Sequence, residues 1–127
     1  MIPYGIGTDI IEIERIREAI AEHGDAFINR IFTPAEQAYC KKHRDPIPHY
    51  AARFSAKESI VKALGCGIGE HISWHDIDIS HDPAGKPLAT LSPAAEKRFN
   101  NPRILISMSH CKAYVSSIAL VFHTHAK

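Results

Sequence analysis

The spacing of the apolar residues changes along this chain from strand-like to helical and back. Residues 2–11 form an apolar, β-branched run, and residues 104–109 and 113–122 are two further strand-like runs. Between these ends, residues 12–22 carry isoleucines three and four positions apart, which indicates a helix with one buried face. Strands at both ends of the chain with helices between them predict an α+β domain.

Local signals place the ends of several of these elements. Thr33-Pro34-Ala35-Glu36 is a capping box with proline at the first helical position, and it predicts a helix that runs to about residue 43. Gly65 is expected to end the longest helix, at 49–64. The other expected elements are a short helix at 25–31, strands at 74–80 and 88–91 around a turn at 82–87, and a helix that starts at Ser92.

Size and charge restrict the class of protein. A chain of 127 residues is expected to form one domain, 1–127. Its net charge of +1, from 15 basic and 14 acidic residues, predicts no nucleic-acid partner, so an anionic substrate would need locally placed cations. The three cysteines form no CxxC pair, and no leader or membrane-length apolar run is present. We therefore expect a cytoplasmic protein that does not enter a membrane.

Glu58 and Lys62 lie four residues apart on the longest expected helix, so they are neighbours on one face. One interpretation is a surface ion pair. The other is a phosphate site, because the lysine directly precedes the glycine-rich segment 65–69, whose backbone amides could bind an anion. The segment matches neither a Walker loop nor a dinucleotide fingerprint.

A second carboxylate, Asp9, ends the sequence Gly5-Ile6-Gly7-Thr8-Asp9 at an apolar strand. It could cap the following helix, or it could join Glu58 in a magnesium site, since Mg²⁺ often takes one or two carboxylates together with water and phosphate oxygens. His110 lies at a strand end, where either a structural or a catalytic role is open. Arg15 is on the polar side of the first helix, interleaved with glutamates, so that side could be simply a solvated surface.

Five segments stand in a specific order along the chain: Gly5 to Asp9 with Arg15, Arg53 to Ser59, Lys62 to Gly69, Gly85-Lys86-Pro87, and Ser107 to His110. Taken in order, these segments closely resemble bacterial holo-(acyl-carrier-protein) synthases, members of the 4′-phosphopantetheinyl transferase family. The resemblance covers nearly the whole chain, and the stretch around Glu58 and Lys62 is its most specific part.

The resemblance implies the small single-domain form of the 4′-phosphopantetheinyl transferase fold, assembled as a homotrimer with sites between subunits. It implies transfer of phosphopantetheine from coenzyme A to a serine of acyl carrier protein, in support of fatty acid biosynthesis. Asp9 and Glu58 would hold Mg²⁺, Lys62 would contact the pyrophosphate and serve catalysis with Glu58, and Arg15 would bind the carrier protein. The coenzyme site would also be lined by Arg53, Gly65, Lys86, Pro87, Ser109 and His110.

Helix geometry qualifies one of these assignments. Arg53 would lie about 140° around the helix from Glu58, so it could serve the site of a neighbouring subunit. The general base remains open between Glu58 and a metal-bound water. Two other classes also remain: a non-catalytic coenzyme-binding module, which needs no paired carboxylates, and a structural oligomerisation domain, which needs no coenzyme.

Overall fold

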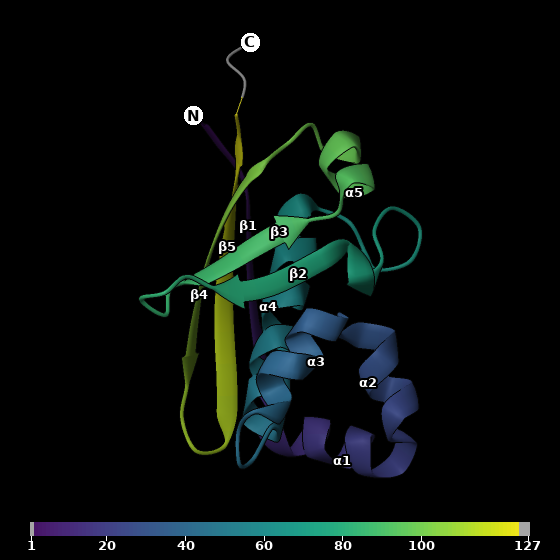
Figure 1. The fold of residues 1–127 in the computed structure, drawn as a ribbon. Coiled ribbons are helices and arrows are strands. Elements are labelled where there is room, and N and C mark those ends of the chain that lie inside the picture. Colours follow the sequence, from purple (N-terminus) through teal and green to yellow (C-terminus); the bar gives the residue numbers. More distant parts are fainter. Residues whose placement is uncertain (1, 125–127) are drawn as a thin grey trace.

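The largest sheet of the protein has three antiparallel strands. The computed structural model describes residues 2–124, and in it β1 (Ile2–Glu12), β5 (Tyr114–His123) and β4 (Arg103–His110) follow one another across the sheet, with β5 in the centre. The long helix α4 (Ile47–Leu64) packs against one face of this sheet, on β1 and β5 (Figure 1). The first half of β1 lies beside the last turns of α4, where Gly5 faces Ala63.

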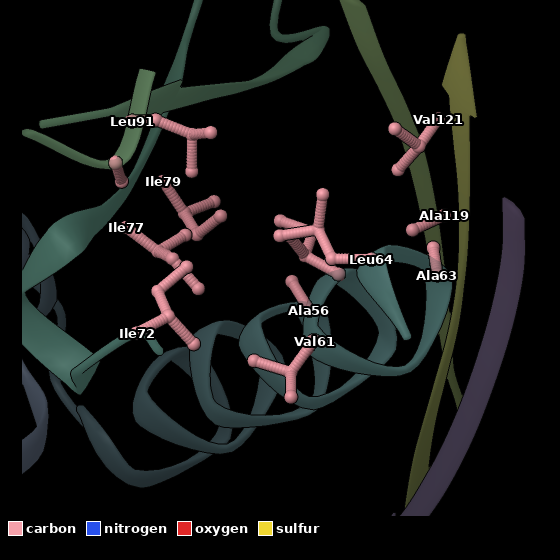
Figure 2. Packing of buried hydrophobic residues seen from close by; sticks show 12 residues of the cluster. Ala56, Val61, Ala63, Leu64, Ile72, Ile77, Ile79, Leu91, Ala119 and Val121 are labelled. Atoms are coloured by element: carbon pink, nitrogen blue, oxygen red, sulfur yellow. The ribbon is translucent and has the colours of Figure 1, made fainter. Parts of the chain in front are cut away.

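The main core lies between this sheet and a small hairpin, with α4 in the middle. Figure 2 shows Leu64 of α4 between Ile79 of the hairpin and Val121 of β5. The hairpin consists of β2 (Ile77–His81) and β3 (Pro87–Leu91). The remaining elements are α1 (Ile13–His23), α2 (Asp25–Ile31), α3 (Pro34–Lys41), the 3₁₀ helix η1 (Trp74–Asp76) and α5 (Pro93–Arg98).

A second core joins α1, α2 and α3 to the first half of α4. Ile16, Phe32 and Tyr50 are buried in it, and the Phe32 and Tyr50 rings lie 4.7 Å apart. Apart from the main sheet, α4 thus contacts helices at its beginning and the hairpin towards its end. Among residues 2–124, no helix is long and apolar enough to cross a membrane.

The structure confirms the α+β class and most of the expected elements, with differences at three places. Residues 74–76 form η1 instead of the start of a strand, because the Ser73 amide donates to the Asp76 carboxylate at 2.9 Å and caps a tight turn. Helix α4 begins at residue 47 and not 49, because the Asp45 carboxylate accepts from the Ile47 amide at 3.2 Å. Helix α3 ends at residue 41, two residues earlier than expected.

Two glycines allow α4 to approach β1 closely. A β-carbon at Gly5 would overlap the carbonyl oxygen of Ala63, and one at Gly7 would overlap that of Ser59. Both obstacles are helix backbone, which cannot rotate away as a side chain could. The glycines therefore set the distance between β1 and α4.

We expect Gly7→Ala to destabilise the fold by about 1–3 kcal/mol, because the added methyl forces strand and helix apart. Gly67→Ala is the matched control, since a β-carbon there meets open space and needs no positive φ. Urea unfolding followed by circular dichroism measures both. Equal stability of the two variants would contradict the close contact between β1 and α4.

Candidate active site

Asp9, Glu58 and Lys62 come together where β1 passes the last turns of α4. Lys62 Nζ donates to the Thr8 carbonyl at 2.9 Å and lies 3.4 Å from Asp9 Oδ1. Its ion-pair partner is thus Asp9 of the neighbouring strand, and not Glu58 as a surface pair on the helix would require. Asp9 does not cap the following helix either, because α1 begins at Ile13 with Glu12 in the N-cap position.

The two carboxylates repel each other in this place. Burial raises the pKa of Glu58, and the charge of Asp9 raises it further, whereas Lys62 acts in the opposite direction. Asp9 Oδ2 is buried and accepts no hydrogen bond from any residue of the described chain. The site therefore holds more negative charge than Lys62 alone balances.

These features fit a bound divalent cation. An unpartnered carboxylate oxygen beside a second carboxylate is a set of hard oxygen donors, which Mg²⁺ prefers. Within residues 2–124, no group of three or more His, Cys, Asp or Glu side chains is placed to hold a metal. A cation at Asp9 and Glu58 would therefore need further ligands from water or from a substrate.

A network of buried serines joins α4 to β5 beside this site, and no sequence motif assigns a function to its members. Ser117 of β5 lies opposite Asp9 in the sheet register. Its hydroxyl is 2.7 Å from the Ser55 hydroxyl and 2.5 Å from that of Ser59, both on α4. The i, i+4 spacing of Ser55 and Ser59 was the available signal, since it places both on one helix face.

A hollow of about 500 Å³ opens beside the charged residues. Asp9, Lys62 and Ser109 line it, and three further serines contribute to its wall: Ser107, Ser116 and Ser117. Hydroxyl groups and an ammonium group can donate hydrogen bonds to an anion such as a phosphate.

Gly65, another expected coenzyme residue, ends α4 in the left-handed conformation, with φ 78°. Its amide donates to the Val61 carbonyl at 3.1 Å.

The other expected coenzyme residues lie elsewhere in the subunit. Lys86 is exposed in the β2–β3 turn, and Pro87 begins β3. Arg53 is 1% exposed, and its guanidinium lies 4.1 Å over the Tyr39 ring. His110 is the last residue of β4, and its charge lowers the pKa of His49 at the start of α4. In the described part of the chain, none of these residues lines the hollow beside Asp9.

Arg15 lies next to a second hollow, also of about 500 Å³. Its Nε is 3.0 Å from the Glu12 carboxylate, and both side chains are largely exposed. Ile10 belongs to the walls of both hollows. A partner that contacts Arg15 would therefore lie close to the carboxylate site.

Comparison with known proteins identifies the class to which this fold and site belong. The 4′-phosphopantetheinyl transferase superfamily matches residues 5–118, so the chain belongs to that superfamily. Within it, the chain is similar to proteins named holo-[acyl-carrier-protein] synthase. It is 49% identical to that of Protochlamydia amoebophila over 91% of this chain and 95% of the relative, and 46% identical to that of Chlamydia muridarum over 97% and 98%.

Solved structures agree with this assignment. The holo-[acyl-carrier-protein] synthase of Neisseria meningitidis superimposes with a TM-score of 0.88 at 38% identity, covering 95% of this chain and 98% of that one. The Helicobacter pylori protein, solved in complex with coenzyme A, gives a TM-score of 0.82 at 35% identity, covering 91% and 98%. The resemblance seen in the sequence motifs is thus confirmed.

Asp9→Asn should lower the pKa of Glu58 towards its ordinary value, because it removes one of the two causes that raise it. Burial remains, so the pKa should stay above that of an exposed glutamate. Carboxyl ¹³C NMR titration of the metal-free protein measures the shift. Glu22→Gln, at an exposed position in α1, is the control, and an unchanged Glu58 pKa in Asp9→Asn would show that the two carboxylates are not coupled.

Proposed function

We propose that this protein transfers the 4′-phosphopantetheine group of coenzyme A to a serine of an acyl carrier protein and releases adenosine 3′,5′-bisphosphate. The observation that carries the proposal is the pairing of Asp9 and Glu58 beside Lys62, with one carboxylate oxygen left without a hydrogen-bond partner among residues 2–124. The names of the similar proteins support the reaction, and the Helicobacter pylori complex supports the coenzyme. The holo carrier protein would serve fatty acid biosynthesis in the cytoplasm.

The chemistry is an in-line displacement at the β-phosphorus of the coenzyme. The serine hydroxyl of the carrier protein gives up its proton to a base, Glu58 or a water molecule, as its oxygen forms the new bond to phosphorus. The bond to the bridging pyrophosphate oxygen breaks, and adenosine 3′,5′-bisphosphate leaves. Asp9 and Glu58 would hold Mg²⁺, which when bound neutralises charge on the pyrophosphate. Lys62 stabilises negative charge on the leaving oxygen, and Ser109, which lines the hollow, would contact the coenzyme.

The working assembly would be a homotrimer with coenzyme sites between subunits. The face of the main sheet away from α4 exposes large apolar side chains, which favours burial against another copy. Its most exposed members are Ile2, Ile6, Ile10, Tyr114 and Ile118. Among residues 2–124, none of Arg53, Lys86 and His110 lines the hollow beside Asp9 and Lys62, which favours a coenzyme site completed by a second subunit. A repeated contact between unlike surfaces closes into a ring.

The carrier protein would dock at Arg15 on α1. This arginine is exposed, and its only ion-pair partner within residues 2–124 is Glu12 of its own turn. An acidic partner could compete with Glu12 for the guanidinium, because exposed pairs of this kind are weak. The hollow beside Arg15 shares Ile10 with the carboxylate site, so a docked carrier serine could reach the phosphate.

Intact mass spectrometry of apo carrier protein incubated with coenzyme A, Mg²⁺ and the enzyme should show the added phosphopantetheine. Asp9→Ala and Glu58→Ala should each reduce the transfer rate by far more than tenfold, because each removes a carboxylate from the proposed metal site. Glu22→Ala, at an exposed carboxylate of α1, should leave it unchanged. Activity within about tenfold of the natural chain, or ~1.4 kcal/mol, in either site variant would refute the metal assignment.

Glu58→Ala subunits mixed with Lys86→Ala subunits should recover part of the activity that each variant lacks alone. In a mixed trimer, some sites receive an intact Glu58 from one subunit and an intact Lys86 from its neighbour. Light scattering should give three times the mass of one chain. A fully active monomer at the assay concentration would rule out a shared site.

A further inference from the structure

Helix α4 carries two lysines that pair with carboxylates, and they are held in opposite ways. Lys57 is fully buried, with Glu36 2.8 Å from its Nζ and two backbone carbonyls at 2.7 and 3.0 Å. The side chain of Lys62 is 53% exposed. Its Nζ donates to the Thr8 carbonyl at 2.9 Å, but the 3.4 Å to Asp9 Oδ1 exceeds the length of an ordinary hydrogen bond. Lys57 is thus fixed, whereas Lys62 can change partners at little cost.

Lys62 is placed to meet a second partner. It lines the hollow beside Asp9, where an anionic substrate would enter. Its long, flexible side chain can turn between neighbouring oxygen atoms. The Thr8 carbonyl is neutral, and Asp9 is the only carboxylate paired with Lys62 among residues 2–124. A pyrophosphate in the hollow would therefore draw the ammonium group away from Asp9, because it offers more negative charge.

The charge of Lys62 acts on both carboxylates of the proposed metal site. It lies 3.4 Å from Asp9 Oδ1. Burial and the charge of Asp9 raise the pKa of Glu58, whereas the charge of Lys62 lowers it. A cation that stabilises two negative charges also repels a second cation from them. Mg²⁺ that arrives without coenzyme would therefore bind at Asp9 and Glu58 against the charge of Lys62.

We propose that Lys62 is a place-holding cation, which neutralises Asp9 and Glu58 until coenzyme A enters and then moves to the pyrophosphate. Before this movement the carboxylate pair binds Mg²⁺ weakly, and after it the pair binds Mg²⁺ more tightly. The site therefore favours Mg²⁺ together with coenzyme A over Mg²⁺ alone. This inference rests on the proposed function, because it takes the two carboxylates as metal ligands and the pyrophosphate as a partner of Lys62.

The first test is the affinity of the coenzyme-free enzyme for Mn²⁺, which suits the same oxygen ligands and is counted by electron paramagnetic resonance. Lys62→Met removes the charge and keeps a long unbranched side chain. Mn²⁺ should bind it about five- to tenfold more tightly than the natural chain, because a repelling charge is gone. Lys62→Gln should show the same gain. Lys62→Arg keeps the charge and should retain the weak affinity.

Two controls locate this gain at the carboxylate pair. Lys41→Met, at an exposed lysine in the last turn of α3, should leave Mn²⁺ binding unchanged. Asp9→Ala added to Lys62→Met should remove the gain, because it deletes one ligand of the proposed site. Mg²⁺ should displace the tightly bound Mn²⁺ from Lys62→Met, since both cations would use the same oxygen atoms.

The possible failures are distinguishable. Equal Mn²⁺ affinity in Lys62→Met and the natural chain would overturn the proposal. Weaker binding in Lys62→Met would also overturn it, because Lys62 would then orient Asp9 for the metal instead of competing with it. If Asp9→Ala leaves the Mn²⁺ binding of Lys62→Met unchanged, the metal assignment of the proposed function is wrong as well.

The second test measures the coupling between coenzyme and metal. Saturating coenzyme A should raise the Mn²⁺ affinity by a larger factor in the natural chain than in Lys62→Met, because only the natural lysine has to leave the carboxylates. Mn²⁺ bound by the coenzyme in solution is the same for both enzymes and is measured without protein. By linkage, Mn²⁺ raises the coenzyme affinity by the same factor. Equal factors in the two enzymes would show that Lys62 does not move to the pyrophosphate, and would overturn the proposal.

Discussion

The ion pair between Lys57 and Glu36 is the contact on which the arrangement of the other elements depends. Both side chains are fully buried, and Lys57 Nζ lies 2.8 Å from Glu36 Oε1. Lys57 also donates to the carbonyls of Ile31 and Trp74 at 2.7 and 3.0 Å, while Glu36 Oε2 accepts from the Ile79 amide at 2.7 Å. Burial lowers the pKa of Lys57 and the charge of Glu36 opposes this. One pair thus joins α3, α4, β2 and the segment before the hairpin, and its satisfied hydrogen bonds offset the cost of burying two charges.

This pair also fixes the rotation of α4 about its axis. Adjacent helix residues point about 100° apart, so with Lys57 directed towards α3 and the hairpin, Glu58 is turned towards Asp9 on β1. Arg53, one turn before Lys57, faces Tyr39 and His81 on the same side as the ion pair. A single helix therefore presents residues to two separate places, and this separation is the physical reason for proposing that two subunits complete one coenzyme site.

The sequence predicts those features that depend on residues close together in the chain, such as the ends of helices. The Thr33–Glu36 capping box and the end of α4 at Gly65 are both confirmed, and the structure adds the left-handed conformation of Gly65. The sequence also contains the Ser73–Asp76 capping box, and this local signal prevails over the strand-like alternation of residues 74–80. The partner of Lys62 could not be predicted, because Glu58 on the same helix and Asp9 on a distant strand offer similar charges. Only the packing of α4 on β1 decides between them.

The candidate site and the core share the same contacts. Gly5 and Gly7 bring α4 against β1, and the hydroxyl of Ser117 ties α4 to β5 at the level of Asp9. Neither the glycine pair nor the serines form part of the paired carboxylates, yet both determine how far Glu58 lies from Asp9. A change in this packing would therefore alter the separation of two like charges as well as the stability of the fold. The proposed Mg²⁺ would tolerate only a narrow range of ligand distances, so the packing that sets the separation of Asp9 and Glu58 also sets whether the two can share one ion.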